Sequence, residues 1–388
     1  MKVAMIYDFG VNRGGGDFVM LNILKALNDV GCKFTLITST PSGLEEALEL
    51  FDFDDRFSEV NIKYVEVPRF LKHPYSIAYM AKRVKNEGYD LYVFSDDVPK
   101  CMRDGKVVCY VHYPHIARIK HPEFVAERYK KSIKGKAMFF LHKCLFPRFF
   151  EYKSIPDGWL LLVNSSLTYT HVSDLLNTDR IILLYPPVDT KRIVSQSKGS
   201  QKEDLVIAIG RFEPERKYED LIYALKKVKA KFKALIIGHS YDNDYVKRLK
   251  KVIRDIDLIG KVKLVFDANR SYILNNLAKA KAIVHTAIRE PFGIAIVEGM
   301  AAGCIPVIRQ GFNGPWIDIT QSGKYGVGFK SPDELVSIIE DILRNYEEYK
   351  VKYNVVSRAL YFDASNFRVR FLNILKTHGS LNFEYALR

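Results

Sequence analysis

The sequence has few cysteines and no long apolar run, and each absence excludes a class of protein. Only five of its 388 residues are cysteines, and none form C-x-x-C spacing, which argues against a disulfide-rich secreted scaffold and for a reducing cytoplasm. No window approaches the roughly 18 apolar residues that cross a bilayer, so we expect any membrane contact to be peripheral. The apolar start, Lys2 to Tyr7, is too short for a signal-peptide core and predicts a buried strand.

Acidic residues are in the minority, with 45 Asp and Glu against 59 Lys and Arg and a formal net charge of +14. This excess predicts anionic partners: nucleotide diphosphates, acidic lipid headgroups or nucleic acid. Charge alone does not choose among them. Hydrophobic residues at 48% and charged residues at 27% are typical of a globular protein, and the length indicates about two domains.

Short apolar runs alternate with amphipathic helical stretches along the chain, which predicts the α/β class with two doubly wound, Rossmann-like parallel-sheet domains. We expect domains over residues 1–190 and 205–360, joined by a polar linker over 191–204. Both would place the carboxyl ends of their strands at a shared cleft, where ligands bind in such sheets. The expected strands are 2–7, 33–38, 62–65, 91–94, 107–111, 160–163 and 181–184, then 205–209, 234–237, 262–266, 282–285 and 305–308.

Two carboxylates eight residues apart, Glu290 and Glu298, bracket the expected start of a helix. Pro291 suits the first helical position, and Gly293 leaves free backbone amides at a positive helix end that can hold an anion. One carboxylate can then face a transferred sugar while the other reaches the ribose of a nucleotide. The simpler interpretation is a surface Glu beside a capped helix.

Two cations, Arg211 and Lys217, follow an expected strand and precede a helical pattern. Arg can hold a diphosphate with two parallel hydrogen bonds, and Lys acts as a point charge. A solvated basic loop is the alternative. Arg216 is a neighbour that could be mistaken for either partner.

Gly14, Gly15 and Gly16 follow the first strand, where the backbone can approach a phosphate closely. They do not form G-x-G-x-x-G, so a nicotinamide site is disfavoured, and a plain tight turn is the alternative. His112 stands at the end of another strand, where from position alone a structural role and a functional role are equally expected.

These motifs resemble the Glu-x7-Glu and Gly-Arg-x5-Lys elements of the retaining glycosyltransferases of family GT4, which have the GT-B fold. Further stretches, Val163-Asn-Ser-Ser166, Leu184-Tyr-Pro-Pro-Val-Asp189 and Asn313-Gly-Pro-Trp316, resemble the alpha-1,2-mannosyltransferases that extend the dolichol-linked core in asparagine-linked glycosylation. The resemblance implies an acceptor-side first domain, a nucleotide-sugar-binding second domain, and a helix over 361–388 that packs back on the first.

The same resemblance implies roles for individual residues. Arg211 and Lys217 would stabilise the departing diphosphate, Glu290 would hold the donor sugar, Glu298 would bind ribose, and His112 would position the donor. The nucleotide-sugar site would also include Gly15, Gly16, Pro291, Phe292, Gly293 and Ile294.

The stretch Ile116 to Lys153 combines ten basic residues and three acidic ones with many apolar side chains. This fits a helix lying on anionic lipid; an ordinary helix pair whose Phe residues fill the core is the alternative. We expect the acceptor or membrane side to include Tyr113, His115, Lys130, Lys131, Phe139 and Phe140.

The sequence therefore predicts a metal-independent hexosyltransferase that moves mannose from GDP-mannose, or another sugar from its nucleotide, onto a lipid-linked glycan at the cytoplasmic membrane face. No cofactor and no metal are expected, because cations and a helix end neutralise the diphosphate; Asp242-Asn-Asp244 is an accidental metal-like spacing. Alternatives are a soluble UDP-sugar-dependent glycosyltransferase, a sugar-nucleotide epimerase and a nucleic-acid-binding protein. No nucleic-acid-binding module is recognisable.

Overall fold

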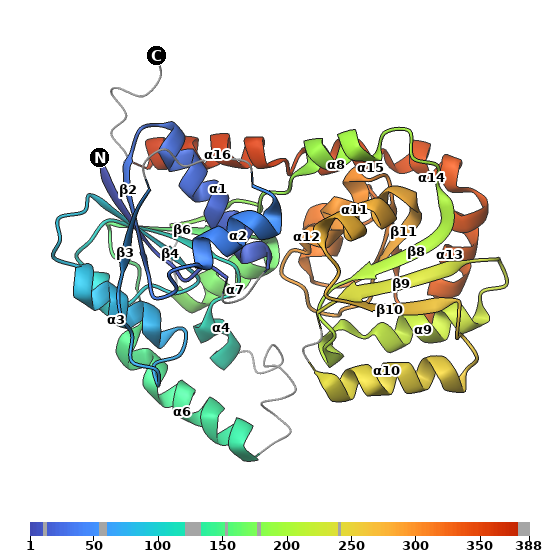
Figure 1. The fold of residues 1–388 in the computed structure, drawn as a ribbon, viewed down its shortest axis with the longest axis horizontal. Helices are drawn as coiled ribbons and strands as arrows, with labels where there is room; N and C mark the ends of the chain where they lie inside the picture. Colours follow the sequence, from blue (N-terminus) through green and yellow to red (C-terminus); the bar gives the residue numbers. More distant parts are fainter. Residues whose placement is uncertain are drawn as a thin grey trace. The chain divides into compact units, whose positions relative to one another are not determined.

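The computed structural model divides the chain into two compact units, one of residues 1–187 with 365–388 and one of residues 188–364. It describes residues 1–10, 14–53, 60–120, 133–151, 154–176, 180–239 and 242–378. Each unit is a parallel sheet covered by helices on both faces (Figure 1). This confirms the predicted fold class of two doubly wound, Rossmann-like domains.

The first unit contains a seven-stranded sheet in the order β3-β2-β1-β4-β5-β6-β7, with every neighbouring pair parallel. Its elements are β1 (Lys2–Ile6), α1 (Gly15–Asp29), β2 (Lys33–Thr38), α2 (Gly43–Phe51), β3 (Val60–Tyr64), α3 (Tyr75–Val84), β4 (Leu91–Ser95), η1 (Lys100–Met102), β5 (Val107–Val111), α4 (His115–Lys120), α6 (Ile133–Phe149), β6 (Trp159–Val163), α7 (Ser166–Leu176), β7 (Ile181–Leu183) and α16 (Ala364–Thr377).

The second unit contains a six-stranded parallel sheet in the order β10-β9-β8-β11-β12-β13. Its elements are α8 (Thr190–Ser197), β8 (Glu203–Ile209), η3 (Pro214–Arg216), α9 (Tyr218–Lys227), β9 (Lys233–Gly238), α10 (Asn243–Asp255), β10 (Val262–Phe266), α11 (Arg270–Lys279), β11 (Ala280–His285), α12 (Ile294–Ala301), β12 (Ile305–Arg309), the π-helix η4 (Pro315–Ile319), β13 (Val327–Phe329), α13 (Pro332–Arg344), α14 (Tyr346–Tyr353) and α15 (Val355–Leu360).

The core of the first unit has one apolar cluster on each face of its sheet. The cluster beneath α1 also contains Phe367, Phe371 and Leu375 from α16, and the other cluster lies under α3 and α7. Helix α16, the last of the described helices, thus completes the core of the unit that contains β1. Phe371 has no exposed surface.

The segment expected to be a linker, 191–204, differs from the prediction. Helix α8 occupies Thr190–Ser197 and β8 begins at Glu203, both inside the second unit. Asp363 holds the start of α8, because its Oδ2 accepts hydrogen bonds from Thr190 Oγ1 at 2.9 Å and from the Lys191 amide at 3.0 Å. The polar sequence reflects the exposed side of a short helix, and only Lys198 to Lys202 connect it to β8.

Candidate functional site

The predicted diphosphate and sugar residues of the second unit lie on two loops that leave adjacent strands. The loop after β8 runs from Gly210 to Tyr218, and the loop after β11 runs from Thr286 to Gly293. Strands β8 and β11 are neighbours, and the strand order reverses between them. This is the switch point of a doubly wound sheet, the position at which such sheets bind ligands.

The structure brings Arg216, rather than Lys217, to Glu290. Arg216 Nη1 forms an ion pair with Glu290 Oε2, and both side chains are largely buried. Lys217 is exposed and has a left-handed backbone, with φ of 53°, where α9 begins. The side chain of Arg211 is half-exposed, and its Nη2 lies 3.1 Å from Glu213 Oε1. Sequence reasoning named Arg216 only as a neighbour, since adjacent cations in a loop give no sign of which points inward.

Glu290 is an ionised carboxylate in a nearly buried environment. Burial by itself would raise the pKa of Glu290, but the guanidinium of Arg216 and the ring of His285 outweigh it and hold that pKa well below its ordinary value. His285 Nε2 lies 3.6 Å from Glu290 Oε2, a contact longer than a hydrogen bond. Burial lowers the pKa of His285, against the opposing effect of Glu290, so His285 is neutral near pH 7.

The helix after Glu290 begins later than the sequence predicts. Helix α12 starts at Ile294, and Gly293 is its N-cap with φ of 95°, a conformation that glycine adopts readily. Pro291 therefore precedes the helix instead of opening it, and Phe292 is buried. The amides at the start of α12 still follow directly on Glu290, as an anion site at a helix N-terminus requires.

The Asn313-Gly-Pro-Trp316 segment holds the Glu290 loop in place. The Gly314 amide donates to the Glu290 carbonyl oxygen at 2.9 Å, and a Cβ at Gly314 would lie 1.8 Å from the Pro291 carbonyl oxygen. Asn313 Oδ1 accepts the Trp316 amide at 3.0 Å and fixes the start of η4. Only glycine fits at position 314, so this motif supports the geometry of the loop.

Glu298 lies on α12 and has a different partner from Glu290. Its Oε1 accepts a hydrogen bond from Arg270 Nη1 at 2.5 Å, and the carboxylate is mostly buried. Arg270 is the first residue of α11 and was not singled out in the sequence. A ribose bound by Glu298 would therefore share the carboxylate with a guanidinium.

In the first unit, the glycine loop and His112 meet beyond the ends of β1 and β5. Gly15 and Gly16 open α1, and a Cβ on Gly16 would lie 3.4 Å from His112 Nε2. Asp96, at the end of β4, accepts the amide of His112 at 2.8 Å and the amide of Tyr113 at 2.9 Å. The order of the sheet also reverses between β1 and β4, so these residues occupy the switch point of their own unit.

The residues expected on the acceptor side occupy several environments. Tyr113 is buried, with its hydroxyl 2.9 Å from His171 Nδ1, and His115 Nδ1 lies 2.6 Å from Asp97 Oδ2. Phe139 and Phe140 belong to α6, where Phe140 is 68% exposed. Lys130 and Lys131 lie outside the described residues.

The apolar side chains of α6 are divided between packing and exposure. Phe146 and the following Phe150 are buried with residues of α3 and α4, as the core-filling alternative predicts. Ile133, Met138, Phe140, Leu141 and Phe149 are exposed. The helix contains four basic residues and no acidic one, and its N-terminal half extends away from the sheet (Figure 1).

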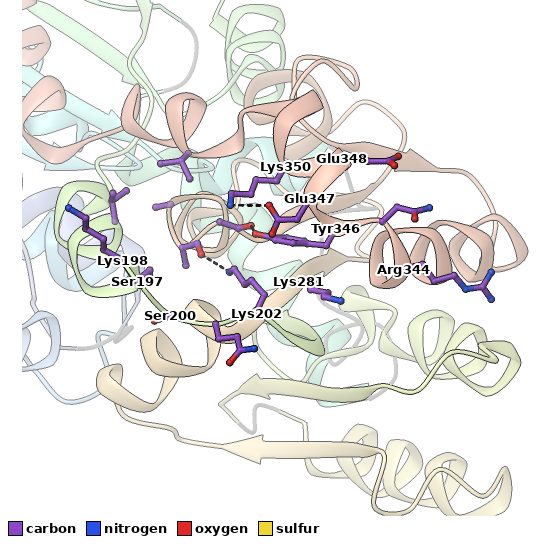
Figure 2. Close-up of a pocket in the computed structure, with 18 residues that line it drawn as sticks. Ser197, Lys198, Ser200, Lys202, Lys281, Arg344, Tyr346, Glu347, Glu348 and Lys350 are labelled. Atoms are coloured by element: carbon purple, nitrogen blue, oxygen red, sulfur yellow. Dashed lines mark hydrogen bonds and ion pairs between the residues drawn. The ribbon is translucent and has the colours of Figure 1, made fainter.

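A cavity of about 750 Å³ lies at the opposite edge of the second sheet from the site loops, near the amino ends of β8 and β11. Lys202 and Lys281 line it (Figure 2). Lys202 Nζ donates to the Ala280 and Ala302 carbonyl oxygens at 2.8 and 2.7 Å, which end α11 and α12. The cations at its floor are therefore bound to the protein itself, and the switch-point loops are the better candidate site.

The part of the chain that the structure describes contains no group of three His, Cys, Asp or Glu residues placed to hold a metal ion. Asp242 caps α10, where its Oδ1 accepts the amides of Asp244 and Tyr245, each at 3.0 Å. Among the described helices, none is both long enough and apolar enough to cross a membrane.

The second unit of the chain matches a known protein family. Residues 189–354 match the family model for glycosyl transferases group 1. The second unit is therefore similar to the group 1 glycosyltransferases over nearly its whole length. The match covers both site loops and every strand of its sheet.

Several curated relatives are named GDP-Man:Man(3)GlcNAc(2)-PP-Dol alpha-1,2-mannosyltransferase. The Dictyostelium discoideum protein is 25% identical over 74% of this chain and 62% of its own length. The Xenopus laevis protein is 28% identical over 72% of this chain and 63% of its own length. The matched region thus spans less than two thirds of these relatives.

Solved structures with the same fold cover nearly the whole chain. Anabaena HepE in complex with UDP and glucose has a TM-score of 0.70 at 19% identity, over 97% of this chain and all of that one. WaaG, a glycosyltransferase involved in lipopolysaccharide biosynthesis, has a TM-score of 0.66 at 15% identity, over 96% and 99% of the two chains. The fold is GT-B, as the sequence resemblance implied.

Proposed function

We propose that this protein is a retaining, metal-independent hexosyltransferase that moves mannose from GDP-mannose onto a lipid-linked glycan. One observation carries the proposal: Arg211, Arg216 and Glu290 share the switch point of a sheet that matches the group 1 glycosyltransferases. The choice of mannose and of a lipid-linked acceptor rests on the activity for which the curated relatives are named.

The reaction begins with departure of the nucleotide diphosphate, which leaves an oxocarbenium-like sugar. Arg211, Lys217 and the amides at the start of α12 take up the growing negative charge of the diphosphate. Fixed donors of this kind contribute about 3 kcal/mol each to a transition state. This charge capture replaces a divalent cation. The acceptor oxygen bonds to the anomeric carbon on the face that the diphosphate leaves, and the hydroxyl proton passes to an oxygen of the departing diphosphate.

The donor sugar and ribose contact the carboxylates. Glu290 accepts hydrogen bonds from sugar hydroxyls and stabilises the positive charge of the sugar, while Glu298 accepts hydrogen bonds from ribose. In the first unit, His112 and Gly16 form the surface that positions the donor sugar, since the glycine leaves space beside the imidazole.

A lipid-linked acceptor requires contact with a membrane, and α6 has the chemistry for it. Its exposed apolar side chains and four basic residues fit the interface of an anionic bilayer. The protein then works peripherally at the cytoplasmic face, where nucleotide sugars are made.

The decisive experiment is a calorimetric screen of GDP- and UDP-sugars followed by transfer assays on lipid-linked acceptors. GDP-mannose should bind, and labelled mannose should enter the lipid extract. Glu290→Gln and Arg211→Met should each lower transfer at least 100-fold, whereas Arg254→Met, a mostly exposed arginine of α10, should not.

Each alternative activity gives a different result in the same assays. Transfer from a UDP-sugar into the aqueous phase would favour a soluble glycosyltransferase, and conversion of the sugar nucleotide without an acceptor would favour an epimerase. Salt-sensitive binding to RNA or DNA, with no turnover of any sugar nucleotide, would overturn the enzyme proposal.

A further inference from the structure

Both described contacts of the Glu290 carboxylate end on the same oxygen. Arg216 Nη1 and His285 Nε2 each approach Oε2, so neither occupies Oε1. Arg216 is itself fixed from behind, because Thr286 Oγ1 donates to the Arg216 carbonyl oxygen at 2.6 Å and Arg216 Nε lies 3.5 Å from Glu213 Oε1. One carboxylate oxygen is held by the protein, and the other is left for a ligand.

We infer that Arg216 is a positioning residue that keeps Glu290 ionised and aims Oε1 at the donor sugar. This inference rests on the proposed function and deepens it. Glu290 is then a hydrogen-bond acceptor near neutral pH, rather than a group that exchanges a proton during turnover. Lys217, the neighbouring cation, remains exposed and available to the diphosphate.

Among the groups around Glu290, Arg216 has the largest effect in keeping the Glu290 carboxylate ionised. Burial disfavours the carboxylate, and the guanidinium opposes burial most strongly; correspondingly, Glu290 contributes to the raised pKa of Arg216. His285 lowers the pKa of Glu290 in the same direction, but each of its effects is smaller than the attraction of the Arg216 charge. The groups that face this trio are Glu213, Tyr218 and Arg309.

The pairing predicts a specific dependence of stability on pH. In the native protein the pKa of Glu290 lies below its value in the unfolded chain, about 4.3, so the stabilisation is present above that pH and is lost below it. In Arg216→Met, burial is no longer opposed by the guanidinium, and the pKa of Glu290 rises. Stability of that variant then falls as the pH rises from about 4.5 toward 7, relative to the native protein.

Urea unfolding between pH 4.5 and 8 tests this without any enzyme assay. The stability gap between native protein and Arg216→Met should widen with pH, and adding Glu290→Gln to Arg216→Met should remove the widening. Arg216→Lys, which keeps a charge, should show a smaller change. A gap that stays constant with pH, or that Glu290→Gln leaves unchanged, would overturn the inference.

A control away from Glu290 is Lys281→Met, which breaks the 2.6 Å ion pair of a largely buried lysine with Asp204 near the amino ends of β11 and β8. Its pH dependence should not respond to Glu290→Gln. In transfer assays, Arg216→Met should lower kcat about 100-fold and shift the acid limb of the rate profile upward by at least one pH unit. If the native protein transfers no sugar, the proposed function fails, while the unfolding experiment still decides the role of Arg216.

Discussion

At the scale of single residues, buried charge in the second unit is matched to backbone or carboxylate partners. Lys202 illustrates this, because its ammonium lies among carbonyl oxygens at the ends of two helices. Burial lowers the pKa of Lys202, while the carbonyl oxygens supply the hydrogen bonds that a buried ammonium requires. The side chain joins α11 to α12 and thereby supports the helix that carries Glu298.

Lys202→Met should lower the free energy of unfolding by about 2 kcal/mol, because it leaves the Ala280 and Ala302 carbonyl oxygens without their charged donor. Urea denaturation at pH 7 measures the change. Lys198→Met, at the exposed rim of the same cavity, is the control and should change stability by less than about 0.5 kcal/mol. Equal effects of the two substitutions would contradict a structural role for Lys202.

Arg216 and Arg270 were not predicted from the sequence, and the physical reason is the same for both: their roles depend on structure that local sequence patterns do not show. Glycine and strand-end patterns indicated the loops that contain Arg211 and Glu290, because those patterns depend on local chain geometry. Whether Arg216 or Lys217 turns toward Glu290 depends on the short helix η3 and on the left-handed residue after it. Arg270 lies 28 residues from Glu298, and no local pattern reports such a pairing.

At the scale of elements, all twelve expected strands are present within a few residues of the predicted ends. Parallel strands that are covered on both faces are continuous apolar runs and are therefore easily recognised. Strand β13 was missed because a glycine interrupts its short apolar run, Val327-Gly-Phe329, whereas the equally short β7 is apolar throughout. Helix α8 was taken for a linker because its buried side chains are few, namely Thr190 and Ile193.

The exposed apolar side chains of α6 predict binding to anionic lipid. The double change Phe140→Ser with Leu141→Ser should weaken binding to vesicles that contain anionic lipid at least 10-fold, because each buried apolar side chain contributes about 1.5 to 3 kcal/mol. Co-sedimentation measures the binding. The free energy of unfolding should hardly change, since the two side chains are 68% and 57% exposed.

Two control variants distinguish lipid binding by α6 from non-specific hydrophobic adsorption to vesicles. Val351→Ser removes an apolar side chain that is 81% exposed on α14 of the second unit and should leave vesicle binding unchanged. Phe146→Ser should unfold the surroundings of α6, since Phe146 is fully buried. Undiminished vesicle binding by the Phe140 and Leu141 variant would exclude α6 as the lipid-facing element.

At the scale of the whole molecule, the two units differ in how the chain builds them. The second unit is one continuous stretch, whereas the first requires α16 from the far end of the sequence. Asn22 and Arg368 join these distant segments, with Arg368 Nη1 donating to Asn22 Oδ1 at 2.7 Å. The sequence resemblance implied this return of the chain; composition and periodicity alone did not.

Phe371→Ala should destabilise the first unit by about 3 to 5 kcal/mol, because it empties a fully buried aromatic site. Calorimetry should show a transition of the first unit shifted to lower temperature. Binding of the nucleotide diphosphate by the second unit should be retained below that transition. If diphosphate binding were instead lost at the temperature at which the first unit unfolds, the two units would unfold as one cooperative structure.

The position of α16 also has a consequence for biosynthesis. While the chain emerges from the ribosome, residues 188–364 can finish folding as soon as they are free of the exit tunnel. Residues 1–187 emerge first but must wait for α16 to complete their apolar cluster with Phe367, Phe371 and Leu375. The usual order of domain maturation, amino-terminal part first, is therefore reversed, and the earlier-made half is the one that needs protection from aggregation during translation.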